Sequence, residues 1–96
     1  MLRQAARAQR RIEQAKAEAK DREVIGEALG GKIKATVTLG KQVKNLEFDE
    51  ALLANEGGEI VRDAICAAIN AGLEQAEKAM SLELEKVTGG VKIPGL

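Results

Sequence analysis

A stretch of 28 residues, 59–86, constrains this chain most, because it contains no proline and only one glycine, Gly72. At 100° per residue its apolar side chains fall on one face and several acidic side chains fall opposite. We therefore predict a single long amphipathic helix. Its apolar face comprises Val61, Ile65, Ala68, Ile69, Gly72, Leu73, Ala76, Met80 and Leu84.

The predicted helix is too long for a compact domain of this size. It would extend roughly 42 Å, whereas a compact monomer of 96 residues has a radius of gyration of only about 12 to 13 Å. A second chain that covered the apolar face would remove it from water, which the hydrophobic effect favours. We therefore expect an obligate oligomer.

The composition predicts one domain, residues 1–96, with an aliphatic core. Hydrophobic residues make up 45% of the chain and aromatic residues only 1%, so the core is built from Ala, Leu, Ile and Val. No run of 18 apolar residues is available to span a membrane. The charged N-terminus has no apolar stretch typical of a secretory signal, so we expect a cytoplasmic protein.

Catalytic and metal-binding patterns are absent from the sequence. The chain has one cysteine and no histidine, so we expect neither an internal disulfide nor a metal site. Cys66 falls at the margin of the apolar helix face, where it is either a small buried side chain or a redox-sensitive thiol at a subunit interface. None of the glycine pairs belongs to a phosphate-binding loop. We expect no enzyme activity, no cofactor and no small-molecule substrate.

Charge is segregated along the chain although the formal net charge is zero. Residues 1–23 carry seven basic and four acidic side chains, and residues 24–48 carry four basic and two acidic ones. Residues 49–86 carry three basic and nine acidic side chains. Such asymmetry predicts one part of the surface that attracts polyanions and another that repels them.

The first 23 residues are rich in alanine and free of glycine and proline, which predicts a second helix. Its apolar residues alternate at steps of four and three, as in a coiled-coil seam. Because alanine buries little area, this seam needs a larger partner. The seam comprises Met1, Ala5, Ala8, Ile12, Ala15 and Ala19.

An arginine row lies about 180° from that seam, formed by Arg3, Arg7 and Arg10, with Arg11 toward its flank. The row either keeps an exposed helix soluble or binds phosphate, whose oxygens match the planar guanidinium fork. The first eleven residues contain no acidic side chain, and the helix dipole disfavours cations at an N-terminus. Local stability therefore gives no reason for this arrangement, whereas an anionic partner would.

Residues 24–48 switch to a period of two, with turn signals at Gly30-Gly31 and Gly40-Lys41. We predict an antiparallel meander with strands at 24–28, 32–39 and 42–48, and a bulge where the third strand breaks phase. Its lysines either protect the sheet from edge pairing or add to a basic surface. They are Lys32, Lys34, Lys41 and Lys44.

Shorter signals organise the remaining chain. Residues 49–54 predict a helical turn capped by Asp49, with Leu52 and Leu53 packed onto the sheet. Residues 55–58 then predict a hinge into the long helix. Gly89-Gly90, followed by Pro94, predicts the helix end, and residues 91–96 have no evident local partner.

Taken in order, these elements resemble the YbaB/EbfC nucleoid-associated family over essentially the full chain. The features that carry the resemblance are Leu46-Glu47-Phe48-Asp49 at the strand end, Ala67-Ala68-Ile69-Asn70 in the long helix, and the Thr88-Gly89-Gly90 and Pro94-Gly95-Leu96 ending. The resemblance implies an α+β subunit of order α-β-β-β-α and a tweezer-shaped homodimer. It also implies double-stranded DNA binding and association with the bacterial nucleoid.

The family supplies no fixed DNA-contact motif, so our contact assignments rest on charge and helix geometry. We predict that Arg3, Arg7, Arg10 and Arg11 contact phosphates, with Lys32, Lys34, Lys41 and Lys44 as secondary contacts. We expect little sequence specificity, because phosphate contacts carry no base information. A dimeric protein adaptor without direct DNA binding is the alternative. The residues expected at the dimer interface are Ile33, Val37, Leu39, Val61, Ile65, Ile69, Gly72, Leu73 and Met80.

Overall fold

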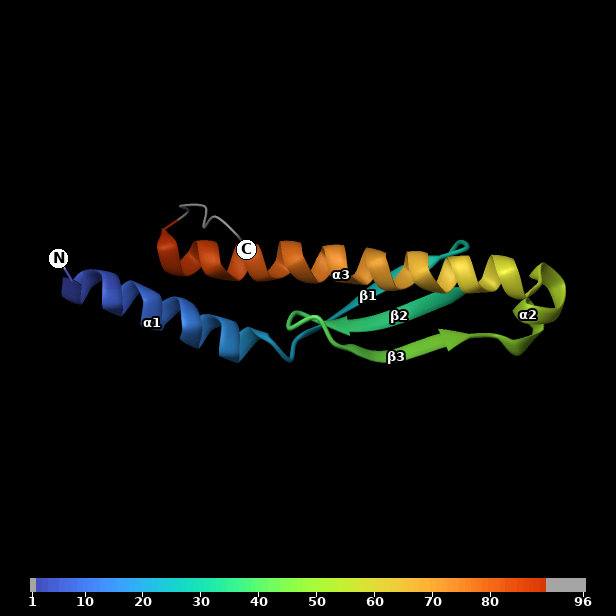
Figure 1. The fold of residues 1–96 in the computed structure, drawn as a ribbon, viewed down its shortest axis with the longest axis horizontal. Coiled ribbons are helices and arrows are strands. Elements are labelled where there is room, and N and C mark those ends of the chain that lie inside the picture. Colours follow the sequence, from blue (N-terminus) through green and yellow to red (C-terminus); the bar gives the residue numbers. More distant parts are fainter. Residues whose placement is uncertain (1, 90–96) are drawn as a thin grey trace.

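The computed structural model describes residues 2–89 and confirms an α+β subunit of order α-β-β-β-α, with one short extra helix (Figure 1). In chain order the elements are α1 (Leu2–Ala19), β1 (Glu23–Ala28), β2 (Ile33–Thr38), β3 (Val43–Phe48), α2 (Glu50–Glu56) and α3 (Gly58–Thr88). The predicted meander is therefore confirmed. The tail at 91–96 lies outside the described residues.

The three strands form one antiparallel sheet in the order β1-β2-β3. Ile33, Ala35 and Val37 of β2 are buried, whereas Lys34 between them is exposed, as the period of two predicts. The predicted bulge is also confirmed, because Thr36 pairs with Asn45 whereas Val37 pairs with Val43. Lys44 is the extra residue of this bulge.

The α3 helix packs chiefly on β1 and β2, and its contact with β1 is unusually close. A Cβ atom added at Gly26 would lie 2.1 Å from the Ala68 carbonyl oxygen and 2.2 Å from the Gly72 backbone nitrogen. A Cβ atom at Gly72 would lie 2.7 Å from Cγ2 of Val37. Only residues without side chains allow the two backbones to approach this closely.

Small residues of α3 line the contact with the sheet. Ala64, Ala68, Gly72 and Ala76, spaced four apart on one helix face, are all buried. They pack with the buried side chains of β2 and with Leu52 of α2. The predicted aliphatic core is therefore present, and Phe48, the only aromatic residue of the sequence, is exposed at the edge of the sheet.

The molecule is elongated because α3 extends beyond the sheet. Its dimensions are 62 × 19 × 16 Å and its radius of gyration is 17.4 Å, compared with about 12 to 13 Å for a compact chain of this length. The C-terminal half of α3 packs against α1, which runs antiparallel to it (Figure 1). Leu84 of α3 and Ala19 of α1 are buried, and Ile12 of α1 is half-buried.

Helix ends follow the sequence signals with a few corrections. Asp49 caps α2 by accepting a hydrogen bond of 2.9 Å from the Ala51 backbone N–H. Gly89 ends α3 at φ +69°, a conformation that glycine adopts without strain. The predicted hinge at 55–58 is wrong, because α2 continues to Glu56 and only Gly57 separates it from α3.

Three further expectations from the sequence need correction. The first helix ends at Ala19 rather than at residue 23, and a turn precedes β1. Leu53 is exposed, because consecutive residues of a helix point in directions about 100° apart, so only Leu52 of this pair faces the sheet. Cys66 is exposed as well, because α3 buries only a narrow stripe of small residues.

The contact at Gly26 yields a first prediction. Gly26→Ala would force its methyl group into the backbone of α3, and neither backbone can move without separating helix from sheet. We expect the free energy of unfolding to fall by roughly 3 kcal/mol or more. Urea denaturation at fixed protein concentration measures the change.

Gly58→Ala is the matched control. Gly58 begins α3, and the only atom near its added methyl group is Cδ1 of Leu53 at 4.0 Å. Because alanine favours helix, this variant should be as stable as the parent or more stable by up to about 1 kcal/mol. Equal stability of the two variants would show that α3 does not lie this close to β1.

Candidate nucleic-acid interface

The predicted arginines lie on α1, near the free end of the molecule. Arg7, Arg10 and Arg11 are exposed, and Arg3 belongs to the first turn of the helix. Ile12, Ala15 and Ala19 lie on the covered side of α1, and Arg7, Arg10 and Arg11 lie on its exposed side. The helix therefore presents a row of guanidinium groups to solvent.

Three of these arginines have no acidic partner in the part of the chain that the structure describes. Among the described residues, Arg7, Arg10 and Arg11 make no hydrogen bond and no ion pair. Glu13, one turn after Arg10, also forms no ion pair with it. No acidic side chain lies in the first turn of α1, where the helix dipole would favour one. The row is therefore available to an external anion.

The β2–β3 turn adds cations beside the base of α1. The Gly40 N–H donates to the Lys20 carbonyl at 2.9 Å, and the Leu39 N–H donates to the Arg22 carbonyl at 2.9 Å. These bonds attach the turn to the chain that leaves α1. Lys41, at the tip of the turn, is exposed at φ +69°, where a residue with a side chain is strained.

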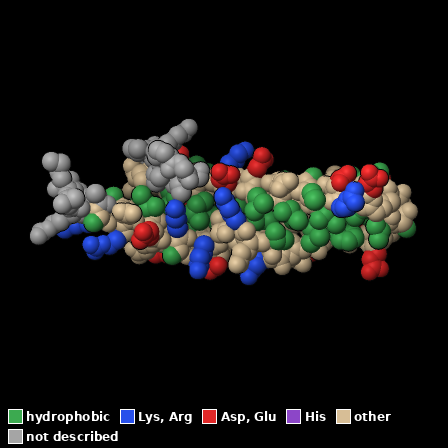
Figure 2. All heavy atoms as spheres, viewed as in Figure 1, with side chains coloured by type: hydrophobic (Ala, Val, Ile, Leu, Met, Phe, Trp, Pro, Cys, Tyr) green, Lys and Arg blue, Asp and Glu red, His purple; other side chains and the backbone are tan. Residues whose placement is uncertain are grey.

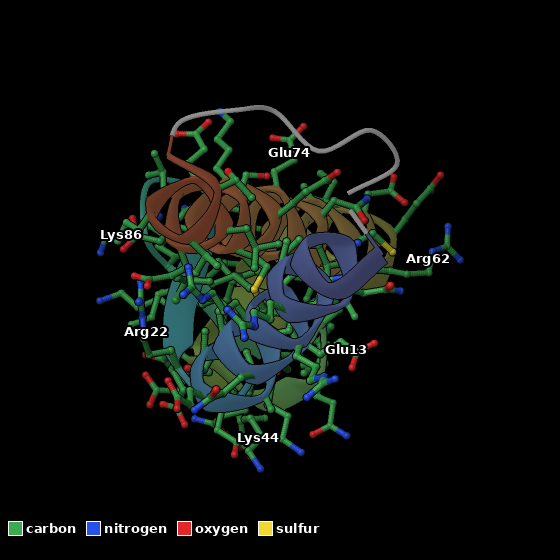
Figure 3. All side chains as sticks on the ribbon, turned by 90° about the vertical axis from the view of Figure 1, so that its left-hand side faces the viewer. Glu13, Arg22, Lys44, Arg62, Glu74 and Lys86 are labelled. Carbon is green, nitrogen blue, oxygen red and sulfur yellow. The ribbon has the colours of Figure 1, made fainter. Side chains whose placement is uncertain are left out.

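Sequence reasoning missed two basic residues of this region. Lys16 belongs to the last turn of α1 and Lys20 directly follows the helix, and they join Lys41 and Lys44 around the base of the helix. Lys44 projects away from α3 (Figure 3). Lys16 and Lys41 line one cleft between α1, the turn and α3. Helical periodicity alone does not place them beside a turn more than twenty residues away.

The remaining predicted lysines lie at the opposite end of the sheet. Lys32 belongs to the β1–β2 turn, and Lys34 follows it on β2. Lys34 pairs across the sheet with Glu27 on one side and Glu47 on the other. Because opposite charges neighbour it on both strands, Lys34 contributes little to a basic surface.

Acidic side chains occupy the other end of the molecule and the outer side of α3. Glu50 and Glu56 lie on α2, and Glu59 and Asp63 lie on the first turns of α3. Figure 2 shows Lys and Arg gathered over the half of the molecule that carries α1. Glu74 projects from α3 on the side away from the sheet (Figure 3). The segregation in space is partial, because Glu77, Glu83 and Glu85 lie on the half of α3 that packs against α1.

An apolar surface lies between α3 and the edge of the sheet, where Figure 2 shows a band of hydrophobic side chains. On α3, Ile65, Ile69 and Leu73 are half-buried beside the stripe that contacts β2. On β3, the side chains that share the face of Ile33, Ala35 and Val37 are incompletely covered. They are Val43, Leu46 and Phe48.

The residues expected at a dimer interface divide into two groups. One group is already buried within a single subunit and comprises Ile33, Val37, Leu39, Val61 and Gly72. The other retains exposed surface and comprises Ile65, Ile69, Leu73 and Met80. Only the second group is accessible to a partner chain. The exposed residues of β3 were missing from the prediction, because the sequence does not show that α3 leaves this strand uncovered.

Neither a membrane-spanning helix nor a cluster of metal ligands is found among the described residues. No helix within 2–89 is long and apolar enough to cross a bilayer. Nor do three or more His, Cys, Asp or Glu side chains converge in this part of the chain as ligands for a metal ion.

Comparison with known proteins identifies a solved structure with the same fold and relatives with similar sequences. A solved structure of an uncharacterized protein from Helicobacter pylori superposes with a TM-score of 0.71 over 88% of this chain and 89% of that one, at 18% identity. A nucleoid-associated protein of Alkaliphilus metalliredigens is 36% identical over 96 residues, which are all of this chain and 84% of that protein.

A nucleoid-associated protein of Psychrobacter sp. is 40% identical over 83 residues, which cover 86% of this chain and 74% of the relative. The sequence profile of the YbaB/EbfC DNA-binding family matches residues 1–91. Because this profile covers nearly the whole chain and both relatives exceed 30% identity, the chain belongs to the YbaB/EbfC DNA-binding family.

Proposed function

We propose that this protein is a homodimer that binds double-stranded DNA with little sequence specificity and takes part in nucleoid organisation and gene regulation. The family assignment and the names of the relatives support the DNA-binding, nucleoid-associated part of this function. The observation that carries the binding mode is that Arg7, Arg10 and Arg11 on α1 are exposed and have no acidic partner among the described residues. Two such helices, one from each subunit, would contact phosphates of one duplex.

Phosphate contacts account for the expected tolerance of sequence. Arginine and lysine side chains bind backbone oxygens, which carry no direct information about the bases. The residues of α1 that could read base edges are few, namely Gln4, Gln9 and Gln14. Affinity therefore comes mainly from counterion release, and it falls as salt rises.

The apolar surface between α3 and β3 supports the dimer. Val43 and Phe48 are 48% and 37% exposed, and Leu46, Ile65 and Ile69 beside them are only partly covered. An aromatic residue in a contiguous exposed apolar surface is typical of a protein interface. A second copy of the same surface, related by a two-fold axis, would cover this patch.

The dimer is tested by an acidic substitution within that surface. Val43→Glu would place an unpaired carboxylate in the interface, which costs several kcal/mol when water is excluded. We expect sedimentation to give about twice the chain mass of 10.2 kDa for the parent and a shift toward the monomer for the variant.

Ile25→Glu is the matched control, because Ile25 is also 48% exposed and also lies on an edge strand. Ile25 pairs with Thr36 and therefore occupies the opposite face of the sheet. This variant should remain dimeric. A dimer that survives Val43→Glu, or that Ile25→Glu disrupts, would contradict the proposed interface.

DNA contact by α1 is tested with the variant Arg7→Ala/Arg10→Ala. Fluorescence anisotropy on a duplex between about 50 and 200 mM salt gives the slope of log affinity against log salt. Each arginine–phosphate pair that is removed flattens that slope by about 0.9, so the two substitutions in both subunits of a dimer would flatten it by about 2 to 4.

Arg62→Ala/Lys78→Ala removes the same charge from exposed positions of α3 and should leave the slope nearly unchanged. If both double variants lose affinity equally, net charge rather than α1 determines binding. If the parent binds no duplex even at low salt, the adaptor alternative replaces DNA binding.

The strained turn residue permits a separate test. Lys41→Gly removes one cation from each subunit and relieves the backbone strain at φ +69°. We expect weaker DNA binding, with a slope flatter by about 1 to 2. Thermal stability should change by less than about 1 kcal/mol, because strain relief offsets the added chain entropy of glycine.

Leu29→Gly is the corresponding control at the β1–β2 turn, where Leu29 has φ +52°. It relieves the same kind of strain at the opposite end of the sheet and removes no charge. DNA binding should match that of the parent. Unchanged binding by Lys41→Gly would remove the turn from the proposed contact surface.

A further inference from the structure

The α1 helix is held at its base more firmly than along its length. Ala19 is buried, Ile12 and Ala15 are half-buried, and Ala8 is exposed. Because alanine contributes little burial, the seam between α1 and α3 constrains the direction of α1 only weakly. Contacts at the base of the helix therefore determine where its arginines lie.

Arg22 connects three parts of the fold through its hydrogen bonds. Its backbone N–H donates to the carbonyl of Ala19 at the end of α1, at 3.0 Å. Its carbonyl accepts the hydrogen bond from Leu39, just after β2, at 2.9 Å. Its guanidinium donates to Glu83 of α3 at 2.5 Å, a contact between residues 61 positions apart.

Glu83 is well placed to hold that guanidinium. Its side chain is 25% exposed, and it also accepts a hydrogen bond of 3.1 Å from Nζ of Lys86, one turn later. The hydrogen bonds from Arg22 and Lys86 lower the pKa of Glu83, so the carboxylate stays charged. Figure 3 shows Arg22 and Lys86 on the same side of the molecule.

Small rotations at this junction would displace the arginines considerably. Arg7 lies twelve residues before Ala19, so roughly 18 Å of helix separates them. A tilt of about 15° would move Arg7 by about 5 Å, which exceeds the rise of about 3.4 Å between successive phosphates on one strand. A contact that fixes the base of α1 thus fixes its register on DNA.

From this geometry we propose that Glu83 is a positioning residue for DNA binding, which acts through Arg22 to set the angle of α1 relative to α3. This inference rests on the proposed contact between α1 and phosphate. It means that an acidic residue favours DNA binding although its charge repels phosphate. Its partner, Arg22, serves as a junction rather than as a phosphate contact.

The direction in which one substitution changes DNA affinity distinguishes this positioning role from a simple effect of charge. Glu83→Gln removes a negative charge, which by charge alone should strengthen DNA binding. If Glu83 positions α1, binding should instead weaken, by about two- to fivefold for each helix, the range that an exposed ion pair of ordinary strength allows. Anisotropy titrations well below the melting temperature measure both effects on folded protein.

Glu85→Gln is the matched control. Glu85 lies two residues away on α3, and its carboxylate forms no ion pair among the described residues. Its substitution removes the same charge at the same end of the molecule. We expect binding equal to or slightly tighter than that of the parent, while sedimentation shows an unchanged oligomeric state for both variants.

Exchanging the charges of Arg22 and Glu83 tests whether an opposite pair restores DNA affinity. Glu83→Arg places like charges together at the junction, so it should bind DNA more weakly than the parent despite its added positive charge. Combining it with Arg22→Glu restores an opposite pair and should recover affinity. Electrostatics without positioning predicts the reverse order, with the single variant binding best.

Two outcomes would overturn the inference. One is a Glu83→Gln variant that binds as tightly as Glu85→Gln or more tightly. The other is a charge exchange that binds more weakly than Glu83→Arg alone. Either result with a parent protein that binds DNA leaves the proposed function intact, whereas a parent protein that binds no duplex contradicts the proposed function itself.

Discussion

The backbone of α3 rests against the backbone of β1 at Gly26, with Gly72 and Ala68 on the helix side of the contact. At this distance the helix can present only a stripe of small residues to the sheet. A narrow stripe covers two strands, β1 and β2, and the larger residues beside it remain half-exposed. The close contact that builds the core therefore also creates the apolar surface beside β3.

The same contact leaves the C-terminal half of α3 free to pack against α1. A helix of 31 residues exceeds the six-residue strands beneath it, so its C-terminal half extends past the sheet and supports α1. That support is thin, because the α1 seam consists largely of alanine. The fold thus separates a rigid body from a lightly packed arm, and the arginines lie on the arm.

Sequence periodicity predicted the elements, because each element buries one regular face. The strands, the bulge near Lys44 and the cap at Asp49 all depend on local pattern and were confirmed. Other features depend on how elements meet. Gly72 and Val37 were expected at a subunit interface, but the sequence could not show that each packs against the other within one chain.

The candidate site was less predictable than the fold for the same reason. Lys41 was grouped with the arginines by charge alone, and only the structure places it beside the base of α1.

A chain with zero formal net charge can still attract DNA at one end, because the molecule is long compared with the range of charge interactions. Screening in physiological salt limits that range to about 8 Å, whereas the subunit measures 62 Å. In the proposed complex, phosphates beside α1 would be attracted by its arginines and would hardly sense the carboxylates around α2. Attraction of this kind depends on where charges lie, so it requires an arm that holds its direction and a body whose acidic end stays away from the duplex.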